Sequence, residues 1–249
     1  MKIILKKKPL YESFDFDSYE DKDEDFGFDA VIESHRYKKF LEENYKVTGT
    51  IKPYKKDGKL FIDVGGDVMV KNRDLTSLTN GRFCFGEVRG SFYCDKCDSL
   101  KTLEGSPEKV FAFSCIECTS LTSLKGSPKF VDNTFSCSYC ISLTSLEGAP
   151  EYVGRDFDCC YCFNLSSLKG APEYVGGYFN CRDCENLISL NGAPKEVGEG
   201  FVCANCQSLT SLKGAPKKVG TDFYCSRCKV EFTKDDVTAV SNVKNNIFC

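Results

Sequence analysis

The residues of this chain best suited to chemistry are cysteines that occur in pairs separated by two residues. One such pair is Cys181 and Cys184, in the stretch FNCRDCENL. Two thiolates at this spacing can hold a zinc ion, and in a suitable fold the same spacing supports a redox-active disulfide. The fold decides between these uses, so the elements that position the pairs have to be identified first.

The cysteine pairs recur at a nearly constant interval. The first members are Cys94, Cys115, Cys137, Cys159, Cys181, Cys203 and Cys225, and the second members are Cys97, Cys118, Cys140, Cys162, Cys184, Cys206 and Cys228. The first interval is 21 residues and the other five are 22, which gives the consensus FxCxxCxxLxSLxG(A/S)PxxVGxx. This period predicts a leucine-rich-repeat solenoid of 21–22-residue coils, about seven or eight of them, stacked through a parallel strand ladder.

Within each coil, the alternation of a strand places Phe and the first Cys of FxC on the inner face. The Ala-Pro or Ser-Pro step fixes φ and removes a backbone donor, so it predicts an irregular or short helical return segment rather than a strand. We assign these residues to the core: Phe135, Cys137, Cys140, Phe157, Cys159, Cys162, Phe179, Cys181, Cys184, Leu187 and Leu190.

The repeats resemble a known family. The runs LTSLEGAPEYVG (143–154), LSSLKGAPEYVGGYFNC (165–181) and LTSLKGAPKKVGTDFYC (209–225) are similar to the cysteine-containing leucine-rich-repeat proteins of large tailed bacteriophages. The resemblance covers about residues 60–240, and VGGDVMVKNRDLTSL (64–78) resembles the irregular first coil of that family. It implies a phage protein in the host cytoplasm, with packaging in a virion as the alternative, and it identifies a repeat class rather than a function.

Four segments are expected. Residues 1–29 form an acidic, aromatic tail, with nine acidic residues and one Lys between 11 and 29, which is typical of a mobile segment and alternatively of a docking peptide. Residues 30–63 predict a helix and a hairpin around Asp57-Gly58 that cap the solenoid of residues 64–231. Residues 232–249 predict a C-terminal cap with a short helix that begins at Thr233.

Three interpretations of the cysteine ladder remain open: a buried structural ladder, a metal site, and disulfide or redox chemistry. The stretch VGGDVMVKNRDL aligns Val70 with the first Cys and has no thiol at the second position. Because valine tolerates burial and cannot bind a metal, this coil favours the structural ladder. We therefore expect neither a metal nor a cofactor, and a zinc-binding repeat protein stays as an alternative.

Several functional classes are disfavoured. The net charge of −3 gives no basic field for nucleic acid. MKIILKKKPL has too short an apolar run for a signal peptide and no 18-residue apolar run occurs, so we expect no membrane partner and a cytoplasmic location. The single histidine, His35, lies in the predicted N-terminal helix, and no Walker loop, Rossmann glycine pattern or paired carboxylates occur. We expect no enzyme and no small-molecule substrate.

If Phe and both cysteines point inward, the residue after Phe and the two residues between the cysteines face outward. We assign partner binding to Tyr93, Glu117, Tyr139, Asp158, Tyr161, Asn180, Arg182, Asp183, Asn205, Tyr224 and Arg227, and expect Tyr139 and Tyr161 to stack one coil apart. The sequence therefore favours a non-enzymatic protein-binding module that recognises a host or viral protein. The alternative is a structural virion component docked by its N-terminal tail.

Overall fold

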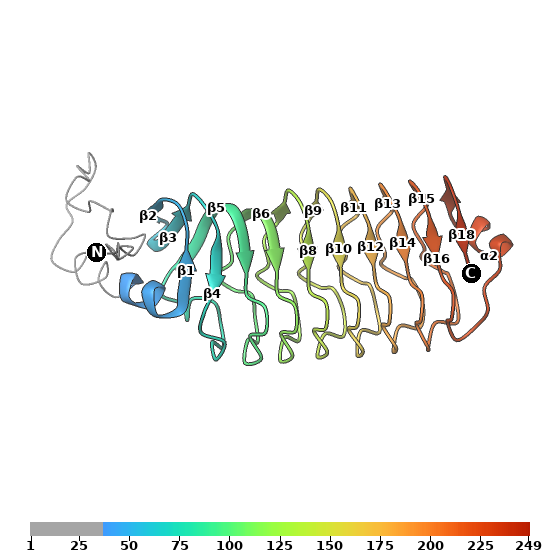
Figure 1. Ribbon diagram of the computed structural model, residues 1–249, viewed down its shortest axis with the longest axis horizontal. Coiled ribbons are helices and arrows are strands. Elements are labelled where there is room, and N and C mark those ends of the chain that lie inside the picture. Colours follow the sequence, from blue (N-terminus) through green and yellow to red (C-terminus); the bar gives the residue numbers. More distant parts are fainter. Residues whose placement is uncertain (1–36) are drawn as a thin grey trace, which may run out of the picture.

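A parallel solenoid makes up the part of the chain that the structure, a computed structural model, describes: residues 37–249 of 249. In this part, 18 strands form one continuous sheet that winds into about nine coils of about 22 residues (Figure 1). The predicted solenoid with small caps is confirmed. It has more coils than the predicted seven or eight, because residues outside the cysteine pairs also join the ladder. The expected tail, residues 1–29, and residues 30–36 with His35 lie outside the described residues.

The first ladder, here called the Phe ladder, contains the FxC strands. Its strands are β4 (Val68–Val70), the ends of β5 (Cys84–Tyr93) and β6 (Lys109–Ser114), β8 (Phe135–Ser136), β10 (Phe157–Asp158), β12 (Phe179–Asn180), β14 (Phe201–Val202), β16 (Phe223–Tyr224) and β18 (Ile247–Phe248). Parallel pairing aligns Phe157 with Phe179 and Phe179 with Phe201. The buried rings stack, with centroids 5.2 Å and 5.5 Å apart for these two pairs. This aromatic column forms the middle of the core.

The second ladder, here called the return ladder, corrects an expectation. It contains β3 (Lys59–Val64), the starts of β5 and β6, β7 (Phe130–Val131), β9 (Tyr152–Val153), β11 (Tyr174–Val175), β13 (Glu196–Val197), β15 (Lys218–Val219) and β17 (Asn242–Val243). The prediction of an irregular or helical return segment was wrong. Pro150 precedes the strand Tyr152–Val153 by two residues, so its missing N–H falls outside the paired residues. Val153 is β-branched and fully buried, which suits a strand.

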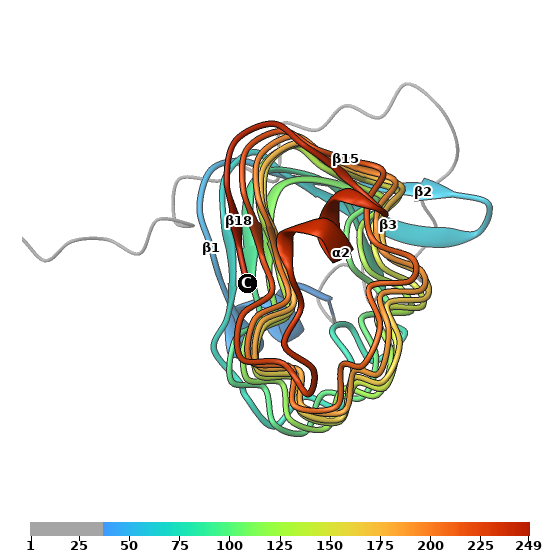
Figure 2. The ribbon, with the colours of Figure 1, turned by 90° about the vertical axis from the view of Figure 1, so that its right-hand side faces the viewer.

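The N-terminal cap closes both ladders. Residues 37–44 are helical, and β1 (Tyr45–Val47) pairs antiparallel with β4. The predicted hairpin is β2 (Ile51–Lys56) with β3, and its turn residues Asp57 and Gly58 have φ of 52° and 71°. Each parallel ladder therefore ends in an antiparallel strand, and the hairpin projects beyond the outline of the coils in Figure 2.

The C-terminal cap is the short helix α2 (Lys234–Thr238). Thr233 accepts a hydrogen bond from the N–H of Asp236 at 3.2 Å, and the Asp236 carboxylate accepts one from the N–H of Thr233 at 2.8 Å. Val237 is fully buried, and α2 lies across the last coil in Figure 2. Neither helical segment within residues 37–249 has the length and apolar character that a membrane crossing requires.

One turn in each coil requires glycine. At Gly192, φ is +90°, and a Cβ atom would lie 2.6 Å from the backbone nitrogen of Lys169 in the neighbouring coil. The equivalent residues of the other coils, from Gly105 to Gly214, are also glycines with positive φ. Close approach of successive coils, together with the left-handed backbone, explains this column.

Candidate protein-binding face

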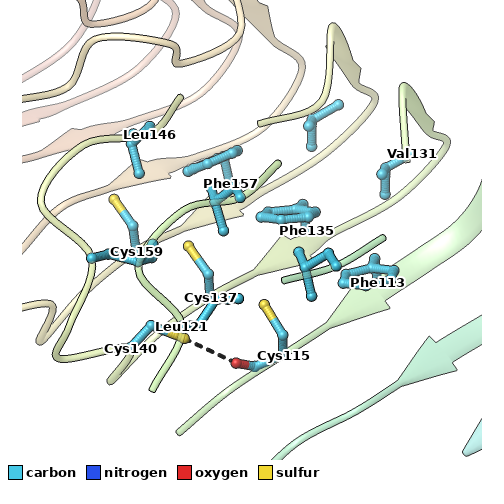
Figure 3. Close-up of a cluster of buried hydrophobic side chains, with 14 of the residues drawn as sticks. Phe113, Cys115, Leu121, Val131, Phe135, Cys137, Cys140, Leu146, Phe157 and Cys159 are labelled. Atoms are coloured by element: carbon cyan, nitrogen blue, oxygen red, sulfur yellow. Dashed lines mark hydrogen bonds between the residues drawn. The ribbon is translucent and has the colours of Figure 1, made fainter. Parts of the chain in front are cut away.

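The interior of the coils holds the residues that the sequence assigned to the core. All eleven of them are fully buried. Figure 3 shows Phe113, Phe135 and Phe157 beside Cys115, Cys137 and Cys159. Each coil contributes one Phe and one Cys, so the residues of each kind form a row across the coils. The cysteine pairs therefore lie inside the solenoid and do not form part of its surface.

The two thiols of a pair have different backbone partners. Cys181 Sγ donates to the carbonyl of Val202 in the next coil at 3.3 Å, an oxygen that also accepts the N–H of Cys181 at 2.8 Å. Cys184 Sγ donates to the carbonyl of Cys159 in the preceding coil at 3.3 Å, and within the described residues no backbone N–H donates to that oxygen. Figure 3 shows the equivalent bond from Cys140 to Cys115, 3.1 Å long. The second thiol thus satisfies a carbonyl at the turn.

The chemistry of these thiols is limited by burial. Burial raises the pKa of Cys181 and of Cys203 well above the ordinary thiol value, so both are protonated at neutral pH. Metal binding and nucleophilic attack both need the thiolate. All 17 cysteines are free, and residues 37–249 contain no group of three or more His, Cys, Asp or Glu side chains placed to hold a metal ion. In this structure the ladder packs the core and donates hydrogen bonds.

The outer side of the Phe ladder, here called the strand face, carries the eleven residues assigned to partner binding. None of them is fully buried, and Tyr139, Arg182 and Arg227 are the most exposed. Tyr139 and Tyr161 stack with ring centroids 4.4 Å apart and an interplanar angle of 10°, as the repeat spacing predicts. Partial burial, and then the neighbouring Tyr161, raise the pKa of Tyr139. The two rings therefore form one aromatic surface near the middle of the face.

Ion pairs flank this aromatic surface. Glu117 lies 3.7 Å from Lys96 of the preceding coil, and Arg182 Nε lies 2.8 Å from Asp183 Oδ2. Lys96, Glu117 and Arg182 are about half exposed and Asp183 is 19% exposed, so solvent screens both pairs and each contributes little to stability. They do leave the surroundings of the tyrosines close to neutral, with both signs available to a partner.

One expectation about the strand face was wrong. Of the two residues between the cysteines, the first is buried in three coils, at Ser138, Cys160 and Ala204. These side chains are small, so larger neighbours cover them, and the Ser138 hydroxyl lies 3.1 Å from that of Ser136. The second residue between the cysteines is the one that reaches the surface in these coils.

That second residue has an unusual backbone. It takes the left-handed conformation in all seven pairs, with φ between 57° and 60°, at Lys96, Glu117, Tyr139, Tyr161, Asp183, Asn205 and Arg227. Asn and Asp tolerate this region, but it strains residues such as tyrosine by about 1–2 kcal/mol. No glycine occurs in this column, whereas the other turn of each coil uses glycine throughout. The strand face therefore keeps large side chains where the backbone alone would favour glycine.

Sequence reasoning missed part of the strand face. A hollow of about 230 Å³ lies between Asp156, Asp158, Tyr178, Asn180 and Val202. Tyr178 and Asp156 precede the buried Phe of their coils, so strand alternation also turns them outward. The signal lies two residues upstream of the predicted column, on the other side of the buried Phe. A second missed contact is the Tyr224–Phe248 stack, with centroids 4.7 Å apart.

A second exposed aromatic column lies on the return ladder. Phe130, Tyr152 and Tyr174 follow one another in three successive coils and are 41%, 43% and 45% exposed. The aromatic-Val step after each Pro carries the signal, because Val points inward and its neighbour outward. It was missed because this segment was predicted to be irregular or helical.

The repeat pattern is the basis for any relationship with known proteins. In comparisons, no protein family matches the chain, and no curated protein or solved structure is significantly similar to it. The resemblance to phage leucine-rich-repeat proteins thus rests on the motifs alone. The function has to be argued from the geometry of the strand face.

Proposed function

We propose that this protein is a non-enzymatic binding module of a phage, which recognises a host or viral protein through its strand face. The phage origin rests on the resemblance of the repeats. The binding role rests on the geometry of one column of residues, the second residue between each pair of cysteines.

The observation that carries the proposal is the contrast between the two left-handed turns of each coil. At the glycine turn, a side chain would collide with the next coil, so the backbone explains the choice of residue. At the cysteine turn, none of the seven left-handed residues is glycine, and five of them are Lys, Glu, Tyr or Arg, which this backbone strains. Strain that the fold does not need is characteristic of functional positions. The side chains of this column are therefore retained for what they present to a partner.

Tyr139 and Tyr161 are the expected centre of the contact. Tyrosines are frequent among residues that dominate binding energy, because they bury a large area at a modest entropy cost. Here the rings are already stacked, so little side-chain entropy remains to be lost on binding. The mixed charges of Glu117 and Arg182 on either side suit the polar rim of a protein interface.

The experiment is affinity capture from a lysate of phage-infected cells with the full chain and a double variant, Tyr139→Asn with Tyr161→Asn. Asn accepts the left-handed backbone, so thermal stability should change by less than about 1 kcal/mol. Binding of the captured protein should weaken by at least about 2 kcal/mol, roughly 30-fold in Kd, when measured with purified components.

The matched control is Tyr152→Thr with Tyr174→Thr, which removes two exposed tyrosines from the return ladder. A partner that the control retains and the Tyr139/Tyr161 variant loses supports the proposal. A partner that binds both variants equally well contradicts a role for the strand face. Recovery of capsid or tail proteins, lost when the acidic residues of segment 11–29 are changed to Asn or Gln, would favour the virion component instead.

A further inference from the structure

A pocket lies at the N-terminal end of the solenoid, away from the strand face. It is an open pocket of about 750 Å³. Its walls come from the hairpin β2–β3, the loop of residues 77–84, the turn at Glu104-Gly105 and the N-terminal helix. This volume lies within the range of pockets that bind small molecules or a short peptide segment.

The charge of this pocket is positive, although the whole chain is acidic. Lys55, Lys59 and Arg82 line it, with Glu104 as the opposing carboxylate. Among the described residues, no carboxylate lies within ion-pairing distance of Lys59 or Arg82. The Arg82 guanidinium carbon lies 4.7 Å from the centre of the Phe40 ring, a contact that keeps the cation at this end of the solenoid.

A second observation concerns a buried hydroxyl in the lining of the pocket. Tyr37 lines the pocket and is only 4% exposed, and its hydroxyl is buried without a partner among the described residues. A buried hydroxyl that makes no hydrogen bond is costly, so such groups are rare without a reason. Burial raises the pKa of Tyr37 to about 12, so the hydroxyl keeps its proton at neutral pH and can donate it to an acceptor.

We propose that this pocket is an anion-binding site, which takes a ligand with carboxylate or phosphate groups. Arg82, Lys59 and Lys55 supply the positive charge, the Tyr37 hydroxyl donates a hydrogen bond, and Leu60 and Phe83 form apolar wall. Ser77 and Thr79 add hydroxyl groups to the lining. The site is separate from the strand face and does not depend on the role proposed for that face.

Two sources can supply this anion. One is a separate small ligand. The other is the chain itself, because segment 11–29 holds nine acidic residues and ends eight residues before Tyr37. Eight residues span up to about 27 Å, and a tether of this length gives an effective concentration on the order of millimolar. The test therefore has to compare the chain with and without these charges.

The experiment is calorimetric titration of the full chain with inorganic phosphate, pyrophosphate, citrate and a synthetic peptide of residues 11–29. Each probe is also titrated into a full chain whose acidic residues between 11 and 29 are changed to Asn or Gln. Saturable binding to both chains identifies a separate anion, and binding that appears only in the neutralised chain identifies the chain's own segment as the occupant. Both results support an anion site, whereas no saturable binding to either chain overturns it.

Variants locate the binding. The double variant Lys59→Gln with Arg82→Gln should lower the affinity for the anion that binds by at least about tenfold, because two charge-assisted contacts are lost. Tyr37→Phe should weaken it several-fold without lowering the stability of the unliganded chain, since it removes an unsatisfied hydroxyl. The control is Lys52→Gln with Arg89→Gln, which removes two exposed cations outside the pocket. Equal weakening by the control would reveal non-specific charge attraction and overturn the assignment.

Discussion

Buried thiols connect the stability of this fold to pH. In twelve buried cysteines the pKa is raised above the ordinary value of 9.0, by burial or by a hydrogen bond to a neighbouring thiol with burial added: Cys94, Cys97, Cys115, Cys118, Cys137, Cys159, Cys160, Cys162, Cys181, Cys203, Cys206 and Cys225. The folded state therefore keeps these protons at a pH where the unfolded chain releases them. The stability they support is complete below about pH 8 and is lost as the pH rises through about 9 and above.

The size of the effect follows from linkage. Each thiol that ionises only in the unfolded chain lowers the free energy of unfolding by about 1.4 kcal/mol per pH unit well above pH 9. For twelve thiols the loss is less than about 1 kcal/mol at pH 8, about 5 kcal/mol at pH 9 and about 10 kcal/mol at pH 9.5. Because domains are typically stable by about 5–15 kcal/mol, we expect cooperative unfolding between about pH 9 and pH 10.

The assay is urea unfolding followed by far-ultraviolet circular dichroism from pH 5 to pH 9.5, with a reductant that prevents disulfides. A variant with Cys181→Val and Cys203→Val should lose stability less steeply with pH, by about a sixth, because two of the twelve thiols are gone. Valine suits this position, since the strand register places Val70 in the same column as Cys94. An unfolding free energy that stays constant from pH 7.5 to pH 9.5 would refute the reasoning. Zinc-bound thiolates would instead make the fold sensitive to acid, because protons compete with the metal.

Three further predictions test the packing of the solenoid core and its turns. In the native protein about three of the 17 cysteines should react quickly with a thiol reagent, and a result near 17 would contradict their burial: the accessible ones are Cys84, Cys228 and Cys249. Gly192→Ala should cost about 2 kcal/mol or more beyond Gly81→Ala in urea unfolding, because both have positive φ but only Gly192 faces backbone within 3 Å. Cys184→Val should cost about 1–3 kcal/mol more than Cys181→Val, because only Cys184 supplies a carbonyl that lacks a backbone donor; equal costs would show that the thiol hydrogen bond is unimportant.

The core of the solenoid could be predicted because the same packing constraint recurs in every coil. Phe179, Cys181 and Leu187 each occupy a column whose members share one environment, so seven repeats report on a single set of contacts. The turn at Asp57-Gly58 and the cap at Thr233 follow local rules of the same clarity. The return ladder was missed because proline was weighed for the segment as a whole, although Pro150 lies outside the paired residues.

The strand face could be predicted only in outline. Strand alternation places Asp158 and Asn180 outward, and the period alone places Tyr139 next to Tyr161. The left-handed backbone of the cysteine turn could not be read from the sequence, because Tyr139 and Tyr161 are residues that normally avoid it. The same mismatch of residue and backbone is the reason that this column, rather than another exposed one, is proposed to bind a partner.

The basic pocket lay beyond sequence reasoning for a different reason. Tyr37, Lys59, Arg82 and Glu104 come from four separate segments, and three of these segments precede the regular repeats, where periodicity gives no information. Net charge was equally uninformative, because a chain of −3 contains a pocket lined by three cations and one carboxylate. In a repeat protein, equivalent residues of the regular coils share one environment, so their roles can be inferred by comparing one coil with the next. Residues that lie outside these columns have to be judged one by one, and the unpartnered Tyr37 hydroxyl beside three cations is the reason for the anion site proposed above.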